Sequence, residues 1–205
     1  MSLTKRQQQG AESREQILDA AERLMGTRGV TGTSMSALIE TSGLPASSIY
    51  WHFGSKDGVL VAVMERGAAR FFSSLAPIES FTGSRADRVR AQLDDTAGAL
   101  EEHGDFLRLL LTLVLLGSEG NAAANAMIAG VRRTARERIE AMLAVAGGPS
   151  LAPQATSGLA DFVLAAIDGA FIGHLEHRRV DLHVLLAQLS LAISALVRDA
   201  RSRGR

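Results

Sequence analysis

Residues 34–56 read SMSALIETSGLPASSIYWHFGSK, and this stretch decides which fold we expect. Its first part predicts a helix over 34–42, since serine is favourable at a helix start and Gly43 can end a helix in a left-handed conformation. Its second part predicts a shorter helix over 45–53, because proline suits the first turn of a helix. Two helices joined in this way form a helix-turn-helix, whose second helix can lie in the major groove of DNA.

The second helix of this motif ends in four consecutive ring side chains, at residues 50–53. Only 4% of the chain is aromatic, and its single tyrosine and single tryptophan are both here. Successive helical residues point about 100° apart, so the four rings cannot all face one core. We expect Leu44, Ile49 and Phe53 to anchor the helix on its neighbours. The side chains left on or near the outer surface are then Pro45, Ala46, Ser47, Ser48, Tyr50, Trp51 and His52.

Two interpretations of this outer surface are open at this point. Small side chains permit close approach to base edges, where an alanine or a ring can meet a thymine methyl group and a serine can bond to either kind of base. Tyr50, His52 and Lys56 carry donors that can reach phosphate oxygens. Alternatively, Tyr50, Trp51 and His52 cover a hydrophobic seam and Lys56 is solvated, because helix-turn-helix shapes also occur as plain packing units.

The composition of the 205 residues limits the class of protein. Hydrophobic residues make up 46% and charged residues 21%, which is typical of a globular chain with a sizeable core. The absence of cysteine excludes disulfides and thiolate metal sites and favours a cytoplasmic location. The N-terminus is polar, unlike a signal peptide, and the longest apolar run, 109–116, is too short to span a membrane. With 22 basic and 22 acidic residues the net charge is zero, which argues mildly against a large non-specific grip on DNA.

Apolar residues recur at helical spacing along nearly the whole chain, and no run alternates in the manner of a strand. The sequence therefore predicts an all-α fold of about nine helices. We place a small helix-turn-helix head at residues 1–55, with a flexible N-terminal arm over 1–12. A larger helical body follows at residues 56–205.

The stretch from Ser13 to about Glu65 resembles the DNA-binding head of the tetracycline-repressor (TetR) family. The family's pattern has an apolar first helix, a glycine four residues before a threonine or serine, and a glycine in the turn. A short helix ending Y-x-H-F follows, with a lysine shortly after it. The match covers about a quarter of the chain, and its residue types and spacing agree together. The matching residues are Gly29, Thr33, Ser34, Gly43, Tyr50, Trp51, His52, Phe53 and Lys56.

The resemblance implies a role in DNA binding for positions on both helices of the motif. Ser34 and Ser36, on the first helix, would approach the DNA backbone or the groove edge. Trp51 would lie against the backbone or a thymine methyl group. The resemblance further implies that the bases are faced by Pro45, Ala46, Ser47 and Ser48, and that phosphates are bound by Tyr50, His52 and Lys56.

This chain departs from the family's pattern in one respect. Many members carry a long basic or amide residue near Ser36 or Ala46, and this chain has neither. We therefore expect few direct contacts that read the bases. The operator would be read partly through DNA shape, or through an arm that carries Lys5 and Arg6.

The last two helices, expected over 153–179 and 181–203, suit pairing with a second copy of the chain. Both carry wide apolar stripes, and the first has a G-x-x-x-G spacing at which another helix can come close. Internal packing explains this spacing about as well. Two such helices from each copy would form a four-helix dimer contact, as in the TetR family. The expected interface residues are Ala166, Gly169, Gly173, Leu182, Leu185, Leu189, Ile193 and Leu196.

The remaining helices of the body would surround a ligand pocket in such a protein. An apolar pocket would suit a hydrophobic or aromatic effector, although apolar helical stripes are more often ordinary core. Either Asp168 or His103 would be its polar contact. We expect no cofactor and no metal, since His174 and His177 lack further ligands at metal spacing. The candidate lining residues are Phe106, Leu109, Leu110, Leu113, Val114, Met127, Ile128, Val131, Phe162 and Asp168.

The sequence thus predicts a DNA-binding transcriptional regulator, most simply a repressor that leaves a near-palindromic operator when a small apolar ligand binds its homodimer. A helical enzyme is one alternative, but the chain has no nucleophile elbow, phosphate-binding loop or metal-spaced ligand set. A second alternative is a helical adaptor whose head binds protein instead of DNA. The salt dependence of binding distinguishes this adaptor from a DNA-binding protein. Phosphate contacts release counterions, so affinity for DNA falls steeply as the salt concentration rises.

Overall fold

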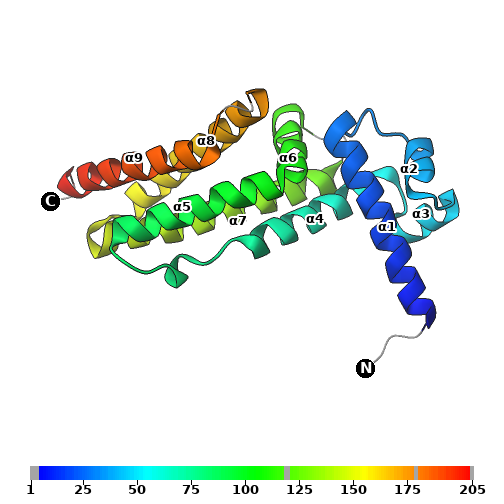
Figure 1. Cartoon of the computed structure of the whole chain (residues 1–205), viewed down its shortest axis with the longest axis horizontal. Helices are drawn as coiled ribbons and strands as arrows, with labels where there is room; N and C mark the ends of the chain where they lie inside the picture. The colour runs from blue at the N-terminus through cyan, green and yellow to red at the C-terminus, as the bar shows by residue number, and fades with distance from the viewer. Residues whose placement is uncertain (1–4, 118–120, 178–179, 204–205) are drawn as a thin grey trace. The chain divides into compact units, whose positions relative to one another are not determined.

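The computed structural model describes residues 5–117, 121–177 and 180–203, and Figure 1 shows them as helices joined by short loops. Over these residues there are nine α-helices, two 3₁₀ helices and no strand, which confirms the predicted all-α fold. The 3₁₀ helices are η1 (Ile78–Ser80) and η2 (Gly148–Ser150). The α-helices are α1 (Lys5–Arg28), α2 (Met35–Ser42), α3 (Ala46–Phe53), α4 (Lys56–Ser74), α5 (Arg85–Glu102), α6 (Gly104–Leu116), α7 (Ala122–Gly147), α8 (Pro153–Glu176) and α9 (Leu182–Arg203).

The first helix begins earlier than the sequence pattern predicts. Residues 5–12, expected to belong to a flexible arm, form the first two turns of α1 instead. Lysine, arginine, glutamine and glutamate are good helix formers, so this polar segment can extend the apolar helix that follows it. Residues 1–4 of the expected arm lie outside the described residues.

By their contacts, the helices group into two compact units, which we name the head unit and the body unit. The head unit comprises residues up to Arg70 together with 103–129, and so contains α1, α2, α3, α6, most of α4 and the start of α7. The body unit comprises residues 71–102 and those from 130 onward, with α5, α8, α9 and the remainder of α4 and α7. The contacts therefore divide the chain within α4, between α5 and α6 and within α7, whereas the boundary placed from the sequence lies between residues 55 and 56.

Helix α1 is the centre of the head unit, because α2, α3 and α6 all pack against it. Leu38 of α2 and Ile49 of α3 are both fully buried in this arrangement. Helices α6 and α4 approach closely at Gly67, where any side chain would collide with the ring of Phe106. The most buried side chains of α1 itself are Ile17, Leu18, Ala20, Ala21 and Met25.

A largely buried arginine joins α4 to α1 within the head unit. The Arg66 side chain is 10% exposed, and its guanidinium donates hydrogen bonds to Glu15, Asp19 and Glu22, which follow one another along α1. Burial lowers the pKa of Arg66, but the bonds to the three carboxylates outweigh it and the pKa is raised overall. The side chain is therefore always charged, and it holds the middle of α4 at a fixed place on α1.

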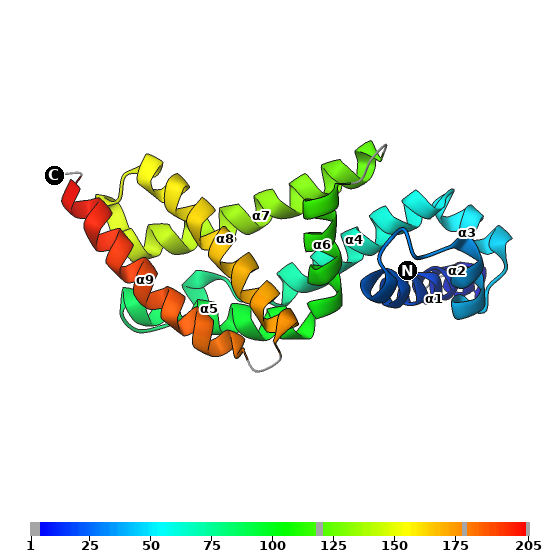
Figure 2. The same ribbon diagram turned by 90° about the horizontal axis from the view of Figure 1, so that it is seen from above.

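In the body unit, α9 packs along α5 and against α8, as Figures 1 and 2 both show. Leu182 and Ile193, which the sequence assigns to a dimer interface, are 0% and 1% exposed within one chain. They belong to the core of the body unit, so that part of the expected interface is wrong. The apolar stripe of α9 is wide enough for two surfaces, and its period does not tell which half faces inward. The buried half consists of Leu182, Leu186, Ser190, Ile193 and Val197.

A histidine–carboxylate pair links α9 to α5. His183 Nδ1 lies 2.6 Å from Asp94 Oδ1, and His183 Nε2 lies 3.9 Å from Glu101. The hydrogen bond to Asp94 raises the pKa of His183, burial opposes this, and the charges of Asp94, Glu101 and Asp181 add to the increase. Protonated His183 thus favours the folded body unit.

We expect His183 to make the stability of the chain depend on pH. Because its pKa is raised in the folded chain, its contribution is complete below the unfolded value of about 6.5 and is lost as pH rises through the folded value. The free energy of unfolding of the wild type, measured in urea from about pH 5.5 to pH 8.5, should therefore fall more than that of His183→Gln. His177→Gln, at the exposed end of α8, is the control and should follow the wild type. Identical pH dependence in the wild type and His183→Gln would contradict the assignment.

Candidate nucleic-acid interface

Local hydrogen bonds fix the turn between α2 and α3. Ser34 precedes α2, and its Oγ accepts a hydrogen bond from the backbone N–H of Ala37 at 3.1 Å. Gly43 follows α2 with a φ of 68°, a left-handed conformation that favours glycine, and its N–H donates to the last turn of the helix. From α1, the side-chain amide of Gln16 donates to the carbonyl of Ser42 at 2.8 Å. These contacts form the helix-turn-helix that the sequence predicts.

Helix α3 has eight residues and one fully buried anchor, Ile49. Leu44 and Phe53, expected beside this anchor, are half-buried. A helix of two turns is too short to be stable alone, so its position depends on the anchor and on the turns at its ends. On its opposite side Tyr50 is 53% and Trp51 is 77% exposed. Near these rings are the small residues, exposed or half-buried, Pro45, Ala46, Ser47 and Ser48.

The rings at the end of α3 contact one another in series, from the exposed side inward. The ring centroids of Trp51 and His52 are 4.5 Å apart with the planes at 76°, and those of His52 and Phe53 are 5.8 Å apart. The guanidinium of Arg14, on α1, lies 5.5 Å from the centre of the Phe53 ring, within range of a cation–π contact. Burial and then the charge of Arg14 lower the pKa of His52, so this ring is neutral at pH 7. No spacing in the sequence relates Arg14 to the end of α3, and this contact was not predicted.

Lys56 makes internal contacts that the sequence does not predict. Its Nζ donates hydrogen bonds to the backbone carbonyls of Val30 at 2.9 Å and Thr33 at 3.0 Å. These bonds tie the first turn of α4 to the segment between α1 and α2. An ammonium group has three N–H donors, so only one of them remains for a DNA phosphate. The phosphate contact expected of Lys56 stays a prediction, and the contacts seen in the structure hold the motif together.

The residues proposed to line an effector pocket are divided between the two units. Those from α6 and the start of α7 belong to the head unit, whereas Val131, Phe162 and Asp168 belong to the body unit. Val114 and Phe162 are 40% and 48% exposed, so both lie at the surface of this chain. Asp168 forms a two-pronged ion pair with Arg132 of α7, with N–O distances of 2.9 and 2.7 Å. Met127 is half-buried, and the side chains buried as core are Phe106, Leu109, Leu110, Leu113, Ile128 and Val131.

These positions therefore act as core, surface or ion-pair residues in the structure, and the apolar pocket remains a prediction. Over the part of the chain that the structure describes, no three histidine, aspartate or glutamate side chains are grouped so as to hold a metal ion. The exposed side of the helix-turn-helix is thus the candidate functional site.

The segment that forms this site matches a known family. Residues 17–63, which run from the middle of α1 through α2 and α3 into α4, match the family model described as bacterial regulatory proteins of the tetR family. This segment of the chain is of the TetR family. The sequence pattern at the turn, at the end of α3 and at the start of α4 predicted this membership.

Individual relatives agree with this assignment. The chain is 34% identical to the transcriptional repressor NemR of Escherichia coli K12 over 94 residues, which are 45% of this chain and 47% of NemR. The chain thus spans about half the length of this curated relative. It is 36% identical over 58 residues to the transcriptional regulator TtgR of Pseudomonas putida, 28% of each chain. These relatives are transcriptional regulators and not enzymes, in agreement with the prediction from the sequence.

Among solved structures, a TetR-family regulator from Streptomyces coelicolor superposes with a TM-score of 0.75 at 19% identity, over 99% of this chain and 85% of the other. At this identity the likeness shows the fold, including the helical body that carries no sequence motif.

The bonds of Lys56 lead to a stability prediction for the head unit. Lys56→Ala should lower the free energy of unfolding by about 2 kcal/mol, because two charge-assisted hydrogen bonds are lost and two carbonyls are left without them. Urea unfolding followed by circular dichroism measures this change. Lys5→Ala, which removes the chain's other lysine at an exposed position in the first turn of α1, should leave the free energy within about 0.5 kcal/mol of the wild type. Equal stability of the two variants would show that the Lys56 bonds contribute nothing.

Proposed function

We propose that this TetR-family chain is a transcriptional repressor whose helix α3 binds the major groove of a near-palindromic operator. The observation that carries the proposal is the contrast within α3, where Ile49 is fully buried while Tyr50 and Trp51 are exposed. Covering large exposed rings with a partner removes apolar surface from water, which favours binding. The relative NemR is named a transcriptional repressor, which supports repression as the direction of control. A small hydrophobic or aromatic effector would bind the body and favour an arrangement that no longer fits the operator.

The side chains around the two rings are small enough for a close approach to DNA, but they offer few hydrogen bonds to the bases. None of the outer residues of α3 can form the paired hydrogen bonds by which arginine reads guanine or asparagine reads adenine. Phosphates would be bound by the Tyr50 hydroxyl, the neutral His52 ring and the third donor of Lys56. Ser34 before α2 and Ser36 on α2 are exposed and can add hydrogen bonds to the DNA backbone. Sequence would then be read by methyl contacts, by single hydroxyl bonds and by DNA shape.

A second copy of the chain would supply the specificity that one α3 lacks, since two copies can meet successive major grooves about 34 Å apart. We place the contact on the exposed sides of α8 and α9. A side chain built on Gly169 or Gly173 would meet nothing within 4 Å, so this part of α8 is open to another helix. The large apolar side chains exposed on the two helices are Phe162, Ile172, Val184 and Leu191.

The same two helices are long and apolar enough to cross a membrane by length and composition alone, with 17% of the apolar window buried in α8 and 33% in α9. Neither helix contains a long uninterrupted apolar run, because charged and polar residues interrupt the apolar residues of both. We favour pairing between copies and a cytoplasmic location, because exposed Asp161 of α8 is held in an ion pair with Arg136 of α7, which lipid would not accommodate.

Trp51 provides the test of DNA binding. The operator is first selected from a random pool of duplex DNA by the purified chain. Trp51→Ala should then weaken binding to the selected duplex by about tenfold or more, because a contact with a base or the backbone is lost. Leu116→Ala is the matched control: this side chain is also 77% exposed and lies on α6, so operator affinity should not change. Unchanged affinity in Trp51→Ala, or a pool from which no sequence is enriched, would favour the adaptor whose head binds protein.

Leu191 provides the test of the dimer interface. Its side chain is 72% exposed in one chain, so Leu191→Glu should leave the monomer folded and place a charge in the proposed contact. Light scattering should show a dimer for the wild type and a monomer for the variant, with circular dichroism unchanged. Leu115→Glu, on α6 and 74% exposed, is the control and should remain dimeric. A Leu191→Glu variant that stays dimeric would place the interface elsewhere.

A further inference from the structure

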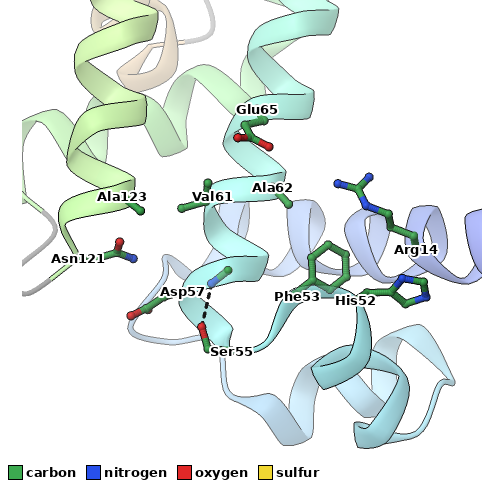
Figure 3. Close-up of a pocket in the computed structure, with 11 residues that line it drawn as sticks. Arg14, His52, Phe53, Ser55, Asp57, Val61, Ala62, Glu65, Asn121 and Ala123 are labelled. Atoms are coloured by element: carbon green, nitrogen blue, oxygen red, sulfur yellow. Dashed lines mark hydrogen bonds between the residues drawn. The ribbon is translucent and has the colours of Figure 1, made fainter.

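A second candidate site lies within the head unit, on the side of α4 that faces the end of α3. The structure has a groove there with a volume of about 390 Å³, which is within the range of small-molecule sites. Figure 3 shows Arg14 and His52 on one side of α4 and Asn121 and Ala123 on the other. The groove adjoins the outer surface of α3 that would meet DNA and shares His52 with it, but neither Tyr50 nor Trp51 lines the groove.

The floor of the groove is apolar and the charges at its two ends are negative. Asp57, Val61 and Glu65 are spaced four residues apart on α4 and all line the groove, so they share one face of the helix. The backbones of Asp57 and Glu65 are about 12 Å apart along the helix axis. Val61 lies between them, and the ring of Phe53 adds a further apolar wall.

The negative charge of this face is unbalanced. Over the described residues, neither Asp57 nor Glu65 forms an ion pair. The one cation among the lining residues is Arg14, whose guanidinium lies 3.3 Å from Glu15 and 5.5 Å from the centre of the Phe53 ring. Burial and the charge of Arg14 lower the pKa of His52, so this ring adds no positive charge at pH 7. A cation would therefore be attracted to the carboxylate at either end of the groove.

We propose that this groove binds an elongated aliphatic diamine, with its amino groups at Asp57 and Glu65 and its hydrocarbon chain on Val61 and Phe53. Eight methylene groups between two ammonium groups match a separation of this order, and such a chain is smaller than the groove. Each end gains an ion pair, while the middle covers apolar surface.

An occupant of the groove would contact α3 directly. His52 and Phe53, which line the groove, lie in the last turn of α3, and the ring of Trp51 meets that of His52 edge to face, with the centroids 4.5 Å apart. Any consequence for DNA binding rests on the proposed function of α3. The binding of the diamine does not, so it can be measured without DNA.

Calorimetry on the full chain tests the site with three probes of one length: 1,8-diaminooctane, octylamine and 1,8-octanediol. We expect the affinity to fall in that order, by about tenfold in total at about 0.15 M salt, since each exposed ion pair contributes a few-fold. The double variant Asp57→Asn/Glu65→Gln should bind the diamine no better than the wild type binds the diol. Glu102→Gln, an exposed carboxylate of α5 outside the groove, is the control and should bind as the wild type does.

The emission of Trp51, the only tryptophan, reports the link to α3 in the same titration and should change in a saturable manner with the diamine. Three outcomes would overturn the proposal: no saturable binding of the diamine, equal affinity for diamine and diol, or unchanged affinity in the double variant. Binding of the diamine with a silent Trp51 would overturn the link to α3. None of these outcomes bears on whether α3 binds DNA.

Discussion

The short length of α3 is the constraint on which the rest of the head unit depends. Eight residues cannot hold a helix in place by themselves, so the surroundings must position it. Ile49 anchors it in the core, and glycines with positive φ angles end both the preceding helix, at Gly43, and α3 itself, at Gly54. Lys56 then fastens the following helix to the segment that precedes α2. With its position set by neighbours in this way, α3 is free to expose large rings on its other side.

The ring cluster shows how packing and exposure are combined in four residues. Phe53 meets the charge of Arg14 on α1, His52 contacts Phe53 at a tilt, and Trp51 contacts His52 edge to face. Each ring limits the freedom of the next, so the exposed indole loses less conformational entropy when a partner covers it. The proposed diamine groove adjoins the inner end of this series, and the proposed DNA surface adjoins the outer end.

Local patterns in the sequence predicted the helices, the turn and the family, because capping residues, glycine positions and helical period act over a few residues. They predicted the buried position of Ile49 for the same reason. The bonds of Lys56 were not predictable, since its acceptors, the carbonyls of Val30 and Thr33, lie 26 and 23 residues away. The start of α1 was placed too late, because polar helix-forming residues at 5–12 give no apolar period to detect.

The body unit shows a second limit of the sequence. The apolar stripe of α9 is wide, and its period alone does not separate the half buried in the chain from the half left at the surface. The structure makes the separation: Leu182 and Ile193 are core, while Leu191 is exposed. The same ambiguity affects the expected pocket, where Phe162 lies at the surface and Asp168 pairs with Arg132. The positions of these side chains depend on tertiary contacts, which a single helical period does not encode.

The most direct test of the account is the emission of Trp51 during titration with the selected operator duplex. As the only tryptophan, it reports on α3 alone. We predict that its emission is quenched, that the change saturates at two chains per duplex, and that salt reverses it steeply because phosphate contacts release counterions. Binding of the duplex with no change in Trp51 emission, or with no dependence on salt, would contradict the claim that α3 is the DNA-binding element.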